Sequence, residues 1–227
     1  HARHETPKVE MFAKTVEGYR EGEVAKAVQK SILERDSVEI VAQCDVVFSC
    51  VDKLDARLFA DLMSSSFLQP LFDVGVSIPT RKVNGVSVIT EVCSRVDYVR
   101  PGGPTLRDRG IYTPETLRAE ELRDSDPAAY EKQLKDGYNK GRREEAPNVI
   151  ALNMRAASDC CMEFLARYFG SRHEPNEGYS RTVVQLAAGD ADVFSERSFT
   201  VDANPWLALG DQEPLLGLPR LRRKLKK

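Results

Sequence analysis

The sequence predicts an α/β fold in which a mostly parallel sheet carries added antiparallel strands and a long, buried late helix. Residues 45–51 form a short β-rich run without polar alternation, which is typical of a parallel strand buried on both faces. A helical pattern over 53–67 and a second β run over 71–78 follow, so the three make a strand–helix–strand unit. Residues 148–169 are apolar on most faces and stop at Gly170, as expected for a helix packed on the sheet.

The segment before the first strand predicts two helices and one ambiguous element. Pro7 suits the first position of a helix and Thr6 suits the cap before it, so we expect an amphipathic helix over 7–20. Residues 24–32 alternate in a way that fits either a strand or a short helix. Asp36 is expected to cap a short helix that ends at residue 41.

A hairpin is expected directly after the strand–helix–strand unit. Asn84-Gly85 is a strong two-residue turn signal, and it joins residues 78–83 to 86–93. Residues 96–99 predict a third strand. Antiparallel strands of this kind are common additions to a parallel sheet.

The rest of the chain predicts helices and one more hairpin. Helices are expected over 114–122 and 127–138, each starting at a proline. The charged run 140–145 is expected to be an exposed loop. Residues 182–186 and 194–201 predict a late hairpin.

Composition points to an ordinary globular protein. Apolar residues make up 41% and charged residues 30% of 227 residues, and no apolar run approaches the roughly 20 residues that span a bilayer. Residues 220–227 hold six of the 33 basic side chains, which leaves 27 basic against 35 acidic residues, or −8, for the rest. A body this acidic argues against general nucleic-acid binding. The basic tail is expected either to be solvated or to touch nucleic acid or an acidic partner.

Cysteine and histidine usage argues against a metal centre and a disulfide framework. The five cysteines are Cys44, Cys50, Cys93, Cys160 and Cys161; none forms a C-x-x-C pair, and three histidines show no metal-binding spacing. We therefore expect no zinc site and a reducing, cytoplasmic setting. The adjacent pair in the late helix is expected to be small core residues.

Four segments together resemble a known family. Residues 6–8 (Thr-Pro-Lys) open a helix, residues 44–52 (CDVVFSCVD) are followed by Arg57, residues 70–76 read PLFDVGV, and residues 147–153 read PNVIALN. In order and spacing they resemble the ThiF/MoeB/HesA family, whose ubiquitin-activating-enzyme-like adenylyltransferase domain is Rossmann-like. The resemblance runs over most of the chain up to Gly170.

The resemblance implies ATP-dependent adenylation of the carboxy-terminus of a ubiquitin-like or sulfur-carrier protein, with ATP and Mg²⁺ as cofactors and a homo- or heterodimer as the assembly. Lys8 matches the family's lysine against ATP phosphate, and Asp52 matches the aspartate that organises magnesium and the nucleotide. Arg57 is a supporting nucleotide-site residue, expected to pair with Asp52 or Asp55. Lys8 also fits an ordinary exposed helix lysine, and Asp52 fits a cap of the next helix.

Three departures qualify the resemblance. The family's glycine-rich loop, ribose-binding acid and following arginine all match positions upstream of His1, so the printed chain is expected to bind ATP poorly. The family's two zinc-binding C-x-x-C pairs would fall at 105–108 and 206–209, and neither segment has a cysteine. Cys93, beside Arg95, is the one candidate for a thioester nucleophile, and a reaction that stops at the acyl-adenylate is the simpler expectation.

These observations predict three parts and leave alternatives open. Residues 1–170 are expected to form an N-terminally incomplete adenylyltransferase domain, 171–219 its β-rich extension, and 220–227 the basic tail. The alternative is a non-catalytic pseudo-enzyme subunit that dimerises with an intact activating enzyme. A different nucleotide-binding α/β domain, such as a dehydrogenase, would need its own glycine-rich fingerprint.

Overall fold

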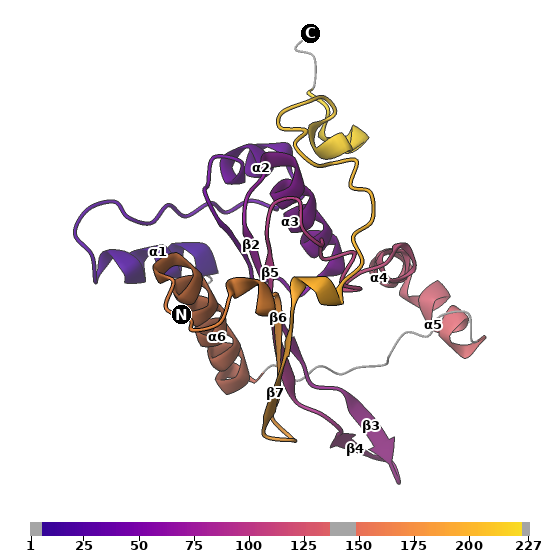
Figure 1. Cartoon of the computed structure of the whole chain (residues 1–227). Helices are drawn as coiled ribbons and strands as arrows, with labels where there is room; N and C mark the ends of the chain where they lie inside the picture. The colour runs from indigo at the N-terminus through magenta and orange to yellow at the C-terminus, as the bar shows by residue number, and fades with distance from the viewer. Residues whose placement is uncertain (1–5, 137–148, 224–227) are drawn as a thin grey trace.

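A computed structural model describes residues 6–136 and 149–223 and shows an α/β fold built on one five-stranded sheet (Figure 1). The sheet order is β1-β2-β5-β6-β7. Its strands are β1 (Val47–Ser49), β2 (Leu71–Ser77), β5 (Cys93–Val99), β6 (Arg181–Gln185) and β7 (Asp190–Phe194). The predicted α/β class is confirmed, but only β1 and β2 are parallel, so the sheet is mostly antiparallel. The prediction overstated the parallel share because the chain returns after β2 through a hairpin and not through a crossover helix.

The predicted strand–helix–strand unit is present as β1, α3 (Leu54–Phe67) and β2. β1 is shorter than expected, and it lies at the edge of the sheet with Phe48 44% exposed. Burial of this strand on both faces was therefore a wrong expectation. An uninterrupted apolar run does not reveal whether other elements cover both faces of a strand.

The hairpin turn at Asn84-Gly85 is confirmed between β3 (Thr80–Val83) and β4 (Val86–Ile89). Both turn residues have positive φ, 52° and 81°, which explains why this pair of residues stands there. The hairpin forms a sheet of its own that projects from the main sheet (Figure 1). The predicted third strand is part of β5, which pairs with β2 and β6 instead. In the late hairpin the second strand is β7, earlier in the chain than the expected 194–201.

The other helices are found close to their predicted positions. They are α1 (Lys8–Glu17), α2 (Arg35–Val41), α4 (Pro114–Ser125), α5 (Pro127–Lys135) and α6 (Ile150–Phe169). Asp36 lies in the first turn of α2, where the cap position is Glu34. The ambiguous segment 24–32 is neither strand nor helix. The charged run 140–145 lies outside the described residues.

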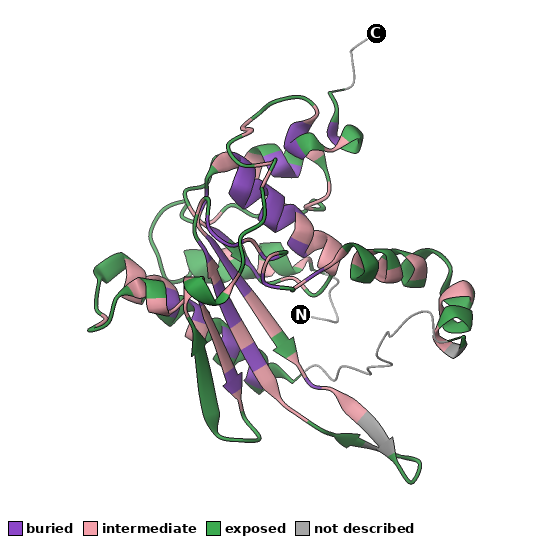
Figure 2. Cartoon of the chain, turned by 45° about the vertical axis from the view of Figure 1, so that its right-hand side comes forward, coloured by how far each residue is buried: buried purple, intermediate pink, exposed green. Residues whose placement is uncertain are grey.

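Helices α3 and α6 cover opposite faces of the sheet (Figures 1 and 2). Leu71 and Val99 pack with Ala60 of α3, whereas Phe72 and Val96 pack with Cys160 of α6. Successive strand residues point to opposite faces, so one run of sequence supplies both cores. The α3 core continues into a third cluster that joins α2 to the segment 215–221.

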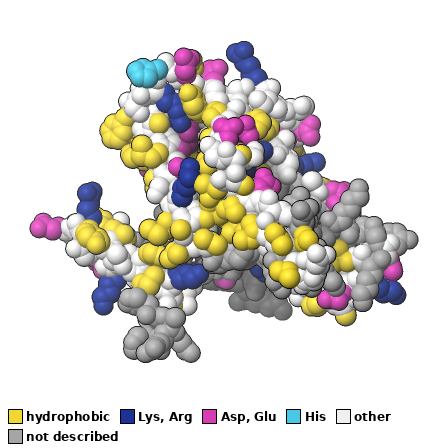
Figure 3. Space-filling model, turned by 90° about the horizontal axis from the view of Figure 1, so that it is seen from below, with side chains coloured by type: hydrophobic (Ala, Val, Ile, Leu, Met, Phe, Trp, Pro, Cys, Tyr) yellow, Lys and Arg dark blue, Asp and Glu magenta, His cyan; other side chains and the backbone are white. Residues whose placement is uncertain are grey.

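Helix α6 is long, as predicted, but it buries one narrow stripe. The buried residues are Leu152, Ala156, Cys160 and Glu163, which recur every three or four positions. Met162 and Tyr168, by contrast, are 63% and 72% exposed. Cys161 is exposed too, so the core expectation holds for Cys160 alone. Exposed apolar side chains also gather on the underside of the molecule in Figure 3. None of the helices in the described part of the chain has the length and apolar content that a bilayer span requires.

Candidate functional site

Four polar residues lie side by side across the sheet, one on each of four strands. Ser49 is in register with Asp73, Asp73 with Asp97, and Asp97 with Arg181. We call these four residues the charged row. They share the face that packs under α3, because Asp73 lies two residues after Leu71. Two carboxylates directly opposite each other would repel, so this row requires cations.

Arginines supply those cations. Arg95 binds both aspartates, with 2.6 Å from Nη2 to the Asp73 carboxylate and a second ion pair to Asp97. Asp97 also binds Arg109 at 3.0 Å and Arg181 at 2.8 Å. Gly75 makes room for this arrangement, since a Cβ there would lie 2.8 Å from Nη2 of Arg95. The sequence reasoning missed this network, although Asp73 and Asp97 are charges within otherwise β-like runs.

Both aspartates of the row are fully buried, so their charges depend on the arginines. Burial raises the pKa of Asp97, but Arg95, Arg181 and Arg109 more than offset burial, and the net pKa lies below its ordinary value. Burial also lowers the pKa of Arg57, against the opposing effect of Asp73. Removing one partner from such a network leaves a buried charge without its counter-ion, which is strongly destabilising.

Arg57 holds the turn that leads into α3. Its guanidinium pairs with Asp73 and donates to the carbonyls of Val51 at 2.7 Å and Val74 at 3.0 Å. The expected pairing with Asp52 or Asp55 is replaced by this buried partner. Because the Val51 carbonyl directly precedes Asp52, Arg57 fixes the backbone that carries that carboxylate.

Asp52 is exposed, three residues beyond the end of β1. The carboxyl ends of strands next to helix starts are where open α/β sheets build ligand crevices. The first N–H groups of α3, those of Leu54 and Asp55, donate to Glu120 Oε2 at 2.8 and 3.1 Å. Glu120 thus occupies the anion-binding start of the helix. The cap interpretation of Asp52 gains no support from these contacts.

Lys8 is the first residue of α1 and is exposed. It borders a shallow hollow with Val28, Lys30 and Glu34 of the irregular segment. The helix start has no side-chain cap, which leaves its N–H groups to other acceptors. Within the described ranges no hydrogen bond or ion pair joins Lys8 to Asp52, so the structure does not bring these two predicted residues into contact.

The surroundings of two cysteines, Cys50 and Cys160, disfavour the thiolate form. Burial raises the pKa of Cys50, and burial raises the pKa of Cys160 to about 12. Cys93 is half-buried on β5, and its thiol donates to the Ser77 carbonyl at 3.8 Å. Among the residues the structure describes, no group of three or more His, Cys, Asp or Glu side chains could hold a metal ion. A magnesium ion at Asp52 would therefore take one protein carboxylate and ligands from nucleotide and water.

Comparison with known proteins gives a fold match without a sequence match. No protein-family profile and no curated protein matches the chain. The solved structure of E. coli MccB with succinimide matches with a TM-score of 0.58 at 10% identity, over 89% of this chain and 51% of that one. MccB with ATP matches with a TM-score of 0.54 at 10% identity, over 90% and 51%.

MccB with AMPCPP and selenomethionine MccA matches with a TM-score of 0.55 at 11% identity, over 85% of this chain and 48% of that one. The chain thus spans about half the length of the MccB structures it matches. At identities this low, the likeness establishes the fold and leaves the activity to be proposed.

Proposed function

We propose that this chain is part of a ThiF-type adenylyltransferase, which uses ATP to activate the carboxy-terminus of a ubiquitin-like or sulfur-carrier protein. The observation that carries the proposal is the shared fold with MccB, which has been solved with ATP and with AMPCPP plus MccA. The position of Asp52 beyond β1 supports it, since the ligand crevice of this fold class opens there.

In the proposed reaction a carboxylate oxygen of the carrier attacks the α-phosphorus of ATP. The new bond gives the acyl-adenylate, and the bond to pyrophosphate breaks. Catalysis of such a step consists of positioning the reactants and stabilising charge on the phosphates. Bound magnesium would supply that positive charge.

Asp52 is the proposed magnesium ligand, because an exposed carboxylate oxygen is the donor this ion prefers. Lys8 is proposed to contact ATP phosphate from the uncapped start of α1. Arg57 is proposed as a positioning residue that acts on the nucleotide site through Val51 and the Asp52 turn.

The remaining expectations become proposals of the same account. Residues 171–219 are proposed as an extension of the main domain, which is supported by the pairing of β6 with β5. All five cysteines are free thiols, which suits a reducing compartment such as the cytoplasm. We propose a dimer as the working assembly on the family resemblance alone.

ATP–pyrophosphate exchange with magnesium and a panel of carrier proteins tests the proposal. We expect exchange by the natural full-length protein, and loss of at least about a hundredfold in rate with Asp52→Asn, the size of loss seen when one charge-stabilising group is removed. Asp45→Asn is the matched control, because this exposed aspartate precedes the same strand at its other end. Equal rates for the two variants would remove Asp52 from the mechanism.

The alternative proposal is a pseudo-enzyme subunit that dimerises with an intact activating enzyme. The lack of contact between Lys8 and Asp52 in the described structure is the observation that favours it. Absence of exchange with every carrier, combined with a stable complex with an intact enzyme in size-exclusion chromatography, would support the alternative.

A further inference from the structure

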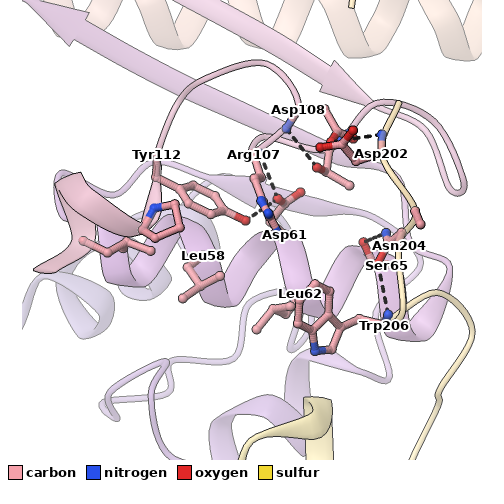
Figure 4. A pocket seen from close by; sticks show the side chains of 14 residues that line it. Leu58, Asp61, Leu62, Ser65, Arg107, Asp108, Tyr112, Asp202, Asn204 and Trp206 are labelled. Carbon is pink, nitrogen blue, oxygen red and sulfur yellow. Dashed lines mark hydrogen bonds between the residues drawn. The ribbon is translucent and has the colours of Figure 1, made fainter. Parts of the chain in front are cut away.

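A cavity of about 170 Å³ lies beside α3 (Figure 4), and Asp52 is not among the residues that line it. It is partly open to solvent and is lined by residues of α3, of the loop that leads into α4, of the start of α4 and of the segment 202–206. Its walls are largely apolar, and the residues that provide them are Leu58, Leu62, Tyr112, Pro114, Leu117 and Trp206. A space of this size holds one aromatic ring, because an apolar cavity of about 150 Å³ binds benzene.

A buried carboxylate without a counter-ion lines this cavity. Asp61 is 3% exposed, and its partners are neutral: the Tyr112 hydroxyl at 2.6 Å and the N–H groups of Leu106 at 3.0 Å and Arg107 at 3.3 Å. No lysine or arginine of the described chain forms an ion pair with it. A buried charge is normally paired, so this carboxylate is exceptional.

The other buried carboxylates show the contrast. Arg57 and Arg95 pair with Asp73, and Arg95, Arg109 and Arg181 pair with Asp97. Glu163 is paired with Arg167 at 2.6 Å and with Arg172. Each of these three therefore has at least two arginines, whereas Asp61 has none among the described residues. Burial raises the pKa of Asp61 to about 6, although Tyr112 and the two N–H groups act in the opposite direction. At neutral pH Asp61 is mainly charged.

The rest of the lining adds negative charge. Asp108 and Asp202 line the cavity together with one cation, Arg107, so the charged lining residues sum to −2 with Asp61 ionised. Asp108 accepts N–H groups from Thr105 at 2.8 Å and Asp202 at 3.4 Å. Figure 4 shows these side chains grouped on one side of the cavity and the apolar ones on the other. The cavity therefore combines an apolar wall with a carboxylate wall.

We propose that this cavity binds a small organic ammonium ion with a flat apolar body. The ring would pack against Trp206 and the leucines, and the ammonium group would supply the counter-ion that Asp61 lacks. Charge complementarity selects this occupant over a neutral or anionic molecule of the same shape. The site is separate from the proposed adenylation site and does not depend on it.

Trp206 provides the assay, since it is the only tryptophan of the chain and lines the cavity. The probe is 2-phenylethylamine, titrated at pH 7.5 and followed by tryptophan fluorescence; 2-phenylethanol is the uncharged control. We expect saturable binding of the amine at least about tenfold tighter than of the alcohol, the factor expected of one charge-assisted hydrogen bond. No saturable change, or equal affinities for the two compounds, would overturn the proposal.

Two further arms identify the carboxylate. With a pKa of about 6, only about a tenth of Asp61 is ionised at pH 5, so amine affinity should fall about tenfold from pH 7.5 while alcohol affinity stays constant. Asp61→Asn should abolish the amine preference. If this variant does not fold, Asp202→Asn should weaken amine binding, and the exposed Asp211→Asn outside the cavity should not. An affinity for the amine that is independent of pH would refute the role of Asp61.

Discussion

Replacing Arg109 by methionine should destabilise the fold more than any exposed arginine substitution. The Arg109 side chain is fully buried, and it reaches five acceptors. It donates to Asp97, to the carbonyls of Pro104 and Tyr98, and to both the carbonyl and the hydroxyl of Ser180, at 2.7–3.0 Å. One side chain thus ties the loop after β5 to β5 itself and to the start of β6. Methionine has similar length and makes none of these bonds.

The expected loss in the free energy of unfolding depends on which interactions the variant keeps. Breaking a buried ion pair costs about 3–5 kcal/mol when the partner is left uncompensated. Asp97 keeps Arg95 and Arg181, which reduces that cost, but the acceptors on Pro104 and Ser180 lose bonds worth about 1 kcal/mol each or more. We therefore expect a loss of about 3–5 kcal/mol in the free energy of unfolding, a large part of the roughly 5–15 kcal/mol that holds a domain folded.

Urea unfolding followed by Trp206 fluorescence measures this loss. With an m-value of about 3 kcal/mol/M, the midpoint should fall by about 1–1.7 M. The control is Arg100→Gln, which breaks the exposed pair with Glu196 at 2.6 Å and should cost under about 1 kcal/mol. A midpoint for Arg109→Met within the range of the control would show that the network does not hold this loop, and the reasoning would be refuted.

Three further predictions concern Gly75, Asp61 and Glu120. Gly75→Ala should displace the Arg95 guanidinium and lower the unfolding free energy by about 1–3 kcal/mol, measured by urea unfolding; an unchanged midpoint would contradict the close contact. The folded-state pKa of Asp61, about 6, lies above its unfolded value of about 3.9, so the folded state binds more protons between these values. The contribution of this residue to stability should therefore fall by about 2 kcal/mol as pH rises from 4 to 7. Thermal unfolding of the wild type and of Asp61→Asn across this range measures the effect. The difference in unfolding free energy between the two proteins should change by that amount, and parallel pH profiles would argue against it. Glu120→Ala should remove the acceptor at the start of α3 and lower the free energy of unfolding by about 1 kcal/mol. A modest fall in the melting temperature would measure this loss. The exposed Glu121→Ala is the control, and no effect is expected for it.

Local patterns predicted most of the elements. The helical period from residue 53 to 67 and the Asn84-Gly85 turn specify structure within a few residues of themselves, and both are found where expected. The apolar content of residues 148–169 and the stop signal at Gly170 were also sufficient to locate α6. These features depend on short-range backbone chemistry, which a single sequence contains.

Pairing and burial could not be read in the same way. The strand at 93–99 looks alike whether it joins the hairpin or β2, because partner choice depends on the distant β6 and on the shared face of the sheet. The exposure of Phe48 and Met162 likewise reflects which neighbours lie beside β1 and α6. A hydrophobic pattern fixes a face and does not fix what covers it.

The candidate site shows the same division. Asp52 was located from a local motif, and the structure places it exposed beyond β1. The partner of Arg57 was mispredicted because Asp73 lies on β2 and becomes a neighbour of Arg57 only when α3 packs on the sheet. The counter-ion deficit of Asp61 was invisible in sequence, since it depends on which side chains the fold brings to α3.

Mass-spectrometric detection of a carrier–AMP adduct tests the central claim most directly. The natural full-length protein would be incubated with ATP, magnesium and a panel of ubiquitin-like and sulfur-carrier proteins, and the carriers' carboxy-termini would be examined. The account predicts an adenylylated carboxy-terminus together with released pyrophosphate, both abolished by Asp52→Asn and retained with Asp45→Asn. Unmodified carriers throughout, with correctly folded protein, would contradict an adenylating function and favour the pseudo-enzyme subunit.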